Sequence, residues 1–401
     1  MALSEQALDD VKVLDASQGI AGPFAAKLLA DYGADVIKVE PPGSGDCARS
    51  QGPFPDDVPH TEKSGLFLYL NTNKRGITLN LASASGRHLF MQLVERVDVI
   101  IESFVPAVLD RLGLGYSQLA QINPRLILAS VTPFGQTGPY AAYDANHLLL
   151  CALGGWAHLC GVPEREPLQA GSYVSHYIAG TYAAIGVLAA LARRGESGQG
   201  EHVDTSAWEA MITCALLPAM RYEYTGQVGV RQSRHMTGPS FIFRCKDGYV
   251  AANVLTQAQW LTLCQFVGHE EWMEDPRFSI GTERAKYTDE IYEQLAPWFS
   301  ERSKDEVFHQ AQLWRLPFAL VPSAEEIVNM EQHQARGYFV EVEHPVAGTF
   351  KYPGAPFKMP LTPFTVSRPA PLLGQHNREV YCELLGLVEA DLVRLRQGGV
   401  I

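Results

Sequence analysis

Short apolar runs alternate with longer amphipathic stretches through the first 140 residues of the chain. The first two runs are Val11–Asp15 and Asp35–Glu40, and between them lie the turn Ser17–Gly19, the helix-like stretch Ala21–Tyr32 and Gly33. Glycine readily takes the left-handed conformation that ends a helix. This order predicts a strand–helix–strand unit, which implies a parallel sheet. The small residues of the turn also suit an anion or a phosphorylated cofactor, although a plain connecting turn is the simpler interpretation.

The same alternation continues after Pro41–His60, a loop rich in Pro, Gly and Asp. Further strands are predicted at residues 77–81, 97–101 and 126–131, with helices at 85–95 and 108–111. This spacing predicts a doubly wound α/β domain. In such sheets ligands lie at the carboxyl ends of the strands. Those ends are predicted at Ile20–Gly22, Pro41, Ala82, Ser103-Phe104 and Thr132–Gly138.

The second half of the chain begins with a long apolar helix that follows Gly171-Ser172 and ends near Arg193-Arg194-Gly195. From about residue 225 the pattern changes. A hairpin is predicted at 241–253 around an Asp-Gly turn, followed by helices at 257–267, 289–299 and 304–313. We therefore expect a large domain at 1–224, a smaller α+β domain at 225–330, and a linker at 331–401 that returns to the large domain.

Composition excludes several classes of function. The chain has 401 residues, of which 46% are apolar and 19% charged, and its net charge is −12. An acidic protein of this kind has no basic face for nucleic acid. The polar start of the sequence does not resemble a signal peptide, and the apolar run Tyr177–Ala192 is short for a membrane span, so we expect a buried helix and no membrane partner.

Cysteine and histidine patterns refine this picture. The seven Cys are scattered without a CxxC pair, which suits packing thiols in a reduced, cytoplasmic protein. The twelve His are also scattered, and His309 and His333 have no partner at ligand spacing. We therefore expect no metal site.

Seven blocks of sequence carry a more specific signal. They are VKVLDASQGIAGPFAAKLLADYGADVIKVEPPGSGD at 11–46, NTNKRGITLNL at 71–81, VDVIIESFVPAVLDRLGLGY at 97–116, NPRLILASVTPFGQTGPY at 123–140, GVLAALARRGESGQGEHVDTS at 186–206, CKDGYVAANV at 245–254 and PAPLLGQHNREVYCELLGL at 369–387. In this order, over nearly the whole chain, they resemble the class III CoA-transferases, or CaiB/BaiF family. This family includes formyl-CoA and carnitine CoA-transferases and the 2-methylacyl-CoA racemases.

The resemblance implies a fold and a binding site. The family has a Rossmann-like large domain built from both chain ends, a smaller domain, and two subunits that interlock as a dimer. Coenzyme A or an acyl-CoA is the substrate, together with a carboxylic acid. The CoA-binding positions carried over to this sequence are Ile20, Ala21, Leu79, Ala82, Ser103, Phe104, Arg111 and Tyr143. Arg111 suits a phosphate, because guanidinium groups pair well with phosphate. Ala82 stands where many relatives have Lys, and Ser103 where most have Asn.

The main departure from the family lies at Ser172. There the family carries an Asp nucleophile, which forms a mixed anhydride with the acyl group and then an aspartyl-CoA thioester. A serine hydroxyl cannot form that anhydride, so the catalytic residues of this chain are unknown. Ser172 is interpreted as the N-cap of the long helix, and a Ser172–His176 pair on one helix face is a less favoured alternative. Tyr143 replaces the racemase His, with Asp144 beside it.

Two classes of function remain. In the first, the chain is the Asp-lacking subunit of a heteromeric transferase, completed by a paralogous subunit that keeps the Asp, in an interlocked heterodimer or heterotetramer. Succinyl-CoA:benzylsuccinate CoA-transferase is such a member of the family. In the second, the chain is a homomeric CoA-transferase with an unconventional nucleophile, or an acyl-CoA racemase or hydrolase.

Some other residues have two interpretations each. Lys74 and Arg75 either meet the phosphates of CoA or form ion pairs at the start of a strand. Four aromatic residues either line an acyl pocket or pack in the core, which is the commoner fate of such residues. They are Trp156, Tyr173, Tyr177 and Trp208.

Overall fold

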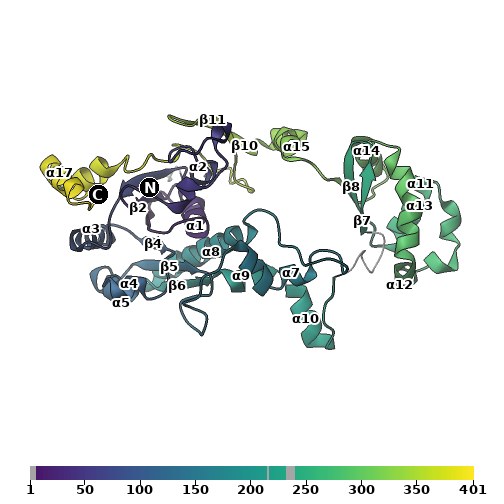
Figure 1. Cartoon of the computed structure of the whole chain (residues 1–401), viewed down its shortest axis with the longest axis horizontal. Coiled ribbons are helices and arrows are strands. Elements are labelled where there is room, and N and C mark those ends of the chain that lie inside the picture. Colours follow the sequence, from purple (N-terminus) through teal and green to yellow (C-terminus); the bar gives the residue numbers. More distant parts are fainter. Residues whose placement is uncertain (1–5, 215, 232–239) are drawn as a thin grey trace. The chain divides into compact units, whose positions relative to one another are not determined.

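The computed structural model describes residues 6–214, 216–231 and 240–401. The chain divides into two compact units, each described here by itself (Figure 1). The large unit contains Met1–Cys160, Leu168–Gly229 and Tyr338–Ile401, and the small unit contains Gly161–Pro167 and Val230–Gly337. The segment 161–167, which the sequence analysis assigned to the large domain, thus belongs to the small unit.

A six-stranded parallel sheet forms the centre of the large unit. Its strand order is β3-β2-β1-β4-β5-β6, the order of doubly wound dinucleotide-binding sheets. The strands are β1 (Lys12–Asp15), β2 (Asp35–Glu40), β3 (Lys74–Thr78), β4 (Val99–Glu102), β5 (Ile127–Thr132) and β6 (His202–Ser206). The predicted parallel α/β sheet is confirmed.

Successive strand residues point to opposite faces of the sheet, and both faces are covered. Val13 and Val36 join one hydrophobic core, whereas their neighbours Leu14 and Ile37 join the other. This explains why the strands are continuous apolar runs, as expected for a parallel sheet with two buried faces.

The large unit contains a set of helices, several of which cover these two faces. They are α1 (Ala21–Ala30), α2 (Gly65–Leu70), α3 (Ala84–Val94), α4 (Val108–Arg111), α5 (Tyr116–Ile122), α6 (His147–Leu153), α7 (Trp156–Leu159), α8 (Val174–Ser197), α9 (Ala207–Cys214), α10 (Leu216–Thr225) and α17 (Glu389–Gln397). Figure 1 shows α1 and α8 side by side. The close approach requires Gly180 of α8, because a Cβ there would lie 2.5 Å from the carbonyl oxygen of Ala21.

Among the described residues, one helix is long and apolar enough to cross a membrane by length and composition. It is α8, which packs against α1, β5 and β6 in the large unit, as expected for the predicted core helix. Its buried positions are mainly small, including Ala179, Ala183 and Val187. One side of α8 thus packs in the large unit, whereas Tyr182, Ile185 and Leu188 of the same helix are exposed.

The C-terminal part of the chain returns to the large unit. A two-stranded antiparallel sheet, β10 (Phe339–His344) with β11 (Gly348–Pro353), precedes an irregular segment. A π-helical segment at Glu379–Leu384 and α17 then complete the second core, with Val380, Tyr381 and Leu392 buried. The side chain of Asn377 accepts from the backbone nitrogen of Thr78 in the edge strand β3, at 2.8 Å.

The small unit has its own core. Strands β7 (Ser240–Cys245), β8 (Gly248–Asn253) and β9 (Phe318–Leu320) form an antiparallel sheet, which confirms the predicted hairpin. Its helices are α11 (Gln257–Val267), α12 (Gly281–Arg284), α13 (Thr288–Ser300), α14 (Lys304–Leu313), α15 (Ala324–Asn329) and α16 (Glu331–Arg336). Stacked aromatic side chains, such as Phe243 on Phe299 with ring centroids 3.9 Å apart, fill the core between them.

Candidate active site

A cavity of about 420 Å³ lies at the carboxyl ends of the parallel strands. We call it the strand-end cavity. Its walls are Gln18–Ala21 after β1, Ser103–Pro106 after β4 and Val131–Pro133 at the end of β5, with residues 142–147 and the start of α8. Strands β1 and β4 are neighbours where the strand order reverses, and ligands of doubly wound sheets bind at this point. The sequence predicted this edge of the sheet.

The N-terminus of α1 opens onto this cavity. Its N-cap is Ile20, which has no side chain able to cap the helix, and the first turn contains no acidic residue. Gly19 makes the preceding turn with a φ of 77°, in the left-handed region that glycine favours. Uncapped amide groups and the helix dipole favour an anionic or carbonyl oxygen at this position.

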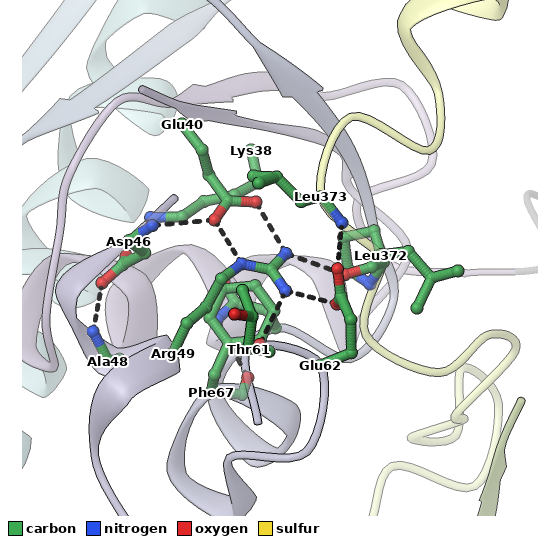
Figure 2. A network of polar contacts seen from close by, with 12 residues as sticks. Lys38, Glu40, Asp46, Ala48, Arg49, Thr61, Glu62, Phe67, Leu372 and Leu373 are labelled. Carbon is green, nitrogen blue, oxygen red and sulfur yellow. Dashed lines mark hydrogen bonds and ion pairs between the residues drawn. The ribbon is translucent and has the colours of Figure 1, made fainter. Parts of the chain in front are cut away.

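One wall of the cavity is held by a buried cluster that we call the charge network (Asp15, Lys38, Glu40, Asp46, Arg49 and Lys74). Figure 2 shows Arg49 paired with Glu40 and with Glu62. Each pair has a distance of 2.6 Å, and the guanidinium of Arg49 also donates to the carbonyl oxygen of Pro371. Asp46 pairs with Lys38 at 2.7 Å and accepts from the backbone nitrogen of Gly19 at 2.9 Å. The network therefore joins the loop after β2 to the turn before α1.

Lys74 belongs to this network and cannot meet a ligand. Its Nζ is 0% exposed and lies 2.8 Å from Asp15, 2.8 Å from the carbonyl oxygen of Pro23 and 2.9 Å from Asn71. Burial lowers the pKa of Lys74 to about 8. Arg75 pairs with Asp35 and Glu379. The phosphate-binding interpretation of Lys74 is thus wrong, and the ion-pair alternative is confirmed for both residues.

The start of β3 follows from the same contacts. The sequence predicted a strand from residue 77, but β3 begins at Lys74. Lys74 is polar and was therefore expected to precede the strand, whereas it is the buried first residue of the strand. Burial alone would raise the pKa of Asp15, but the charges of Lys38 and Lys74 outweigh it and hold that pKa below its ordinary value. The pair of charges makes a polar residue acceptable in a buried strand.

The eight predicted CoA-binding residues separate into two groups. Five line the strand-end cavity: Ile20, Ala21, Ser103, Phe104 and Tyr143. Three do not: Leu79 is buried in the core, and Ala82 and Arg111 are exposed. Ser103 accepts from the backbone nitrogen of Gln18 at 2.9 Å, which fixes the turn before α1. Among the residues that the structure describes, the cavity lining contains Asp144 and no Lys or Arg, so it suits the uncharged part of a ligand better than its phosphates.

Ser172 does not cap the long helix, so that prediction is wrong. Helix α8 begins at Val174, its N-cap is Tyr173, and no side chain caps it. Ser172 is exposed, with a φ of 60° in the left-handed region that is unusual for a residue with a side chain. Ser172 therefore lies outside the helix, and the proposed pairing with His176 on one helix face is wrong too.

His176 instead belongs to a buried cluster that we call the His–Ser–His network (His147, Ser175 and His176). The Oγ of Ser175 lies 2.7 Å from Nδ1 of His147 and 3.0 Å from Nδ1 of His176. Nε2 of His147 lies 2.8 Å from the carbonyl oxygen of Ala170. The sequence analysis missed His147 and Ser175, which lie 28 positions apart. The local signal near them is Asn146, a typical N-cap residue, which indicates a helix that begins at His147.

Ser172 lines a second hollow that we call the aromatic pocket, with a volume of about 470 Å³. Its lining includes Tyr69, Tyr177, Phe350, Tyr352 and Phe54, with Lys63 and Lys351. Tyr173 lines both this pocket and the strand-end cavity. Of the four aromatic residues considered for an acyl pocket, Tyr173 and Tyr177 thus lie at a pocket, whereas Trp156 and Trp208 pack against the core.

No metal centre is evident in the part of the chain that the structure describes. Within residues 6–214, 216–231 and 240–401, no three His, Cys, Asp or Glu side chains gather as a metal ion would require.

Comparisons with known proteins agree with this arrangement. The profile of CoA-transferase family III matches residues 8–377. A succinyl-CoA–D-citramalate CoA-transferase of Chloroflexus aurantiacus is 36% identical over 98% of both chains. A formyl-CoA:oxalate CoA-transferase of Streptomyces coelicolor is 32% identical over 100% of both. The crystal structure of a CaiB/BaiF family protein from Brucella suis is similar, with a TM-score of 0.86, 30% identity, and coverage of 95% of this chain and 100% of that one.

Proposed function

The chain belongs to CoA-transferase family III, and we propose that it takes part in moving CoA between an acyl-CoA, such as succinyl-CoA, and a carboxylic acid. We assign it the role of the subunit that lacks the nucleophilic Asp, completed by a paralogous subunit that has one. The acyl-CoA arm would enter the strand-end cavity along Ile20, Ala21, Ser103, Phe104 and Tyr143, all of which line it.

One observation carries the assignment of this role. Ser172, at the position that the resemblance assigns to the nucleophile, is an exposed hydroxyl that lines the aromatic pocket, next to Tyr173 at the strand-end cavity. A carboxylate at this point would form the acyl anhydride and then the CoA thioester, and a hydroxyl can do neither. A second subunit would have to supply the carboxylate.

Exposed apolar residues support a partner subunit. On α8, Tyr182, Ile185 and Leu188 follow one another at helical spacing, and Ile185 is 54% exposed. On α6, Leu148, Leu149 and Leu153 are between 45% and 52% exposed. Apolar side chains gathered on a surface are typical of protein interfaces. We propose that an interlocked heterodimer or heterotetramer covers them.

The aromatic pocket supports an acid with an aromatic group as one substrate. Aromatic side chains line it, and Lys63 and Lys351 bring two ammonium groups to its edge. Such a pocket suits a ligand with a ring and a carboxylate. Among acids handled by heteromeric members of the family, benzylsuccinate has this form, and we propose it as the first acid to test.

The experiment measures CoA transfer from succinyl-CoA to benzylsuccinate, citramalate and oxalate by the purified chain. The chain is assayed alone, together with any co-encoded paralogue that carries the Gly-Asp pair, and as the Ser172→Asp variant. We expect activity with the paralogue only, and its loss when the Asp of the paralogue is replaced. Ser172→Asp tests whether the pocket still supports the chemistry once a carboxylate is restored.

The alternative outcomes discriminate between the functions. Activity of the chain alone would overturn the subunit role in favour of a homomeric transferase, and Ser172→Ala and Asp144→Asn would then identify the nucleophile. Hydrolysis or racemisation of an acyl-CoA without transfer to an acid would overturn the transferase role. A matched control is Ser85→Asp, which places the same carboxylate at another exposed serine, in the first turn of α3 and outside the residues that line the aromatic pocket.

A further inference from the structure

The His–Ser–His network has a defined direction of hydrogen bonds. A carbonyl oxygen only accepts, so Nε2 of His147 donates to Ala170. The other contacts of His147 are the hydroxyl of Ser175 and the thiol of Cys151, which are neutral and can each donate to a ring nitrogen. In a neutral imidazole the second nitrogen is an acceptor.

The direction continues to His176. Because Nδ1 of His147 accepts, the Ser175 hydroxyl donates its proton to it at 2.7 Å. The Ser175 oxygen then accepts from the Nδ1–H of His176 at 3.0 Å. Since Nδ1 of His176 carries the proton, Nε2 of the same ring has a free lone pair. A chain of three hydrogen bonds therefore sets the tautomer of His176.

We infer that the free nitrogen lies on the cavity side of the ring. Ser175 is 0% exposed, so the Nδ1 edge of His176 is directed into the protein, whereas the ring itself lines the strand-end cavity. Ser175 cannot be a nucleophile for the same reason. The rings of His147 and Tyr173 face His176, and Asp144 lines the same cavity. Burial, and then the nearby His147, lower the pKa of His176 to about 4, so its lone pair is available at neutral pH.

We propose that His176 is a specificity-determining residue whose Nε2 accepts a hydrogen bond from a donor on the pantetheine arm of CoA. Ser175 and His147 are positioning residues that keep this nitrogen unprotonated. The inference deepens the proposed function and rests on it for the identity of the ligand. The arm offers three kinds of donor, which are its amide N–H groups, its pantoate hydroxyl and the terminal thiol. No proton leaves the ligand in this contact, because His176 only accepts a hydrogen bond.

The first test reads the tautomer and needs no ligand. Nitrogen-15 NMR of the full chain labelled at its histidine rings is assigned with His176→Gln and His147→Gln. We expect the proton on Nδ1 of His176 and on Nε2 of His147. In Ser175→Ala the His176 ring should become a mixture of the two tautomers, because the oxygen that accepts from its Nδ1–H is gone. A proton on Nε2 of His176 in the parent protein would overturn the proposal.

The second test measures binding of CoA and of desulfo-CoA, in which a methyl group replaces the thiol, by calorimetry. His176→Phe keeps a ring of similar size without the acceptor and should weaken CoA binding about tenfold. His176→Gln keeps an acceptor and should recover part of that loss. If desulfo-CoA loses affinity to the same extent in His176→Phe, the donor is an amide or the pantoate hydroxyl; if it loses none, the donor is the thiol.

The chain offers a matched control for Ser175→Ala. Ser130 is also a buried serine bonded to an imidazole, His202, at 2.8 Å, but it lies outside the strand-end cavity. Ser130→Ala should leave the His176 tautomer and CoA affinity unchanged. Equal CoA affinity in the parent and in His176→Phe would overturn the inference and leave the proposed function standing. Absence of CoA binding in the parent would instead overturn the proposed CoA site, and the tautomer would still be measurable.

Discussion

Two buried polar clusters flank the strand-end cavity, and they differ in charge and in where they end. The charge network pairs each cation with a carboxylate. Its cations also donate to backbone carbonyl oxygens, which belong to Ser17, Pro23 and Pro371. The His–Ser–His network contains no carboxylate, Lys or Arg and ends on a ring that lines the cavity. Buried charges need partners on every side, so they suit the fixing of loops. A neutral cluster can leave one acceptor for a ligand at low cost.

The largest effect is expected where the charge network is broken. Asp15→Asn removes the carboxylate that lies 2.8 Å from Lys74 and 3.8 Å from Lys38, so two buried ammonium groups lose their shared partner. The free energy of unfolding of the large unit should fall by about 3–5 kcal/mol. Urea unfolding monitored by circular dichroism measures this change.

An exposed ion pair provides the control for that variant. Arg378 and Glu389 pair on the surface, with side chains 70% and 66% exposed. Arg378→Gln should cost less than about 1 kcal/mol. If Asp15→Asn and Arg378→Gln lowered the free energy of unfolding equally, burial would not explain the contribution of the charge network to stability.

A smaller effect is expected where α1 and α8 meet, between the two clusters. In Gly180→Ala the new methyl group would lie 2.5 Å from the carbonyl oxygen of Ala21, at the start of α1. The helices must separate, which should lower the free energy of unfolding by about 2 kcal/mol. Gly195→Ala in the same helix meets no atom within 4 Å and should be neutral or slightly stabilising. A thermal unfolding comparison of the two variants tests the difference, and equal melting temperatures would contradict it.

The sheet could be predicted from sequence because its signal is local. Apolar runs such as Asp35–Glu40 match β2 residue for residue, and the turn before α1 was placed at the ligand edge of the sheet. The prediction failed where a tertiary contact overrides the local pattern. Lys74 looks like a residue outside a strand until Asp15, 59 positions away, neutralises it.

The two clusters could not be predicted for the same reason. His147 and Ser175 carry no motif, and their contact depends on how α6 packs against α8. The cap predicted at Ser172 is typical of a serine before a helix. The structure starts the helix at Val174, one residue later than a cap at Ser172 would, and holds Ser172 in a left-handed conformation, which a serine after a glycine does not indicate.

The two clusters should also respond differently to pH. The pKa of His176 is about 4 in the folded protein and near 6.5 in the unfolded chain, so the unfolded state binds the proton first. The free energy of unfolding therefore falls as pH decreases from about 6.5 to 4. Asp15 has a lowered pKa, so its contribution is present above its ordinary value of 3.8 and is lost only below it.

The measurement is the difference in unfolding free energy between the parent and His176→Gln across pH 4–7. Removing His176 should flatten the slope by on the order of 1–2 kcal/mol over this window, less than a fully buried ring would give. Part of the pH dependence of the unfolding free energy should remain in both proteins, because three other histidines also have lowered pKa values: His202, His344 and His376. A slope unchanged by the substitution would show that His176 titrates normally.

The smallest effect is expected at the cap that positions His147. Asn146 precedes α6, and its side chain accepts from the backbone nitrogen of Leu149 at 3.1 Å. Asn146→Ala should cost about 1 kcal/mol, and Asn146→Asp should retain most of the cap. If the His–Ser–His network depends on the start of α6, Asn146→Ala should also change the populations of the two His176 tautomers. The control is Ser83→Ala, which removes a similar cap from α3. It should lower the free energy of unfolding by as much and leave the tautomer unchanged. Equal tautomer signals in the two Ala variants would mean that Ser175 alone orients His176. In that case the hydrogen-bond direction of the network would be set by Ser175 of α8 and would not depend on the start of α6.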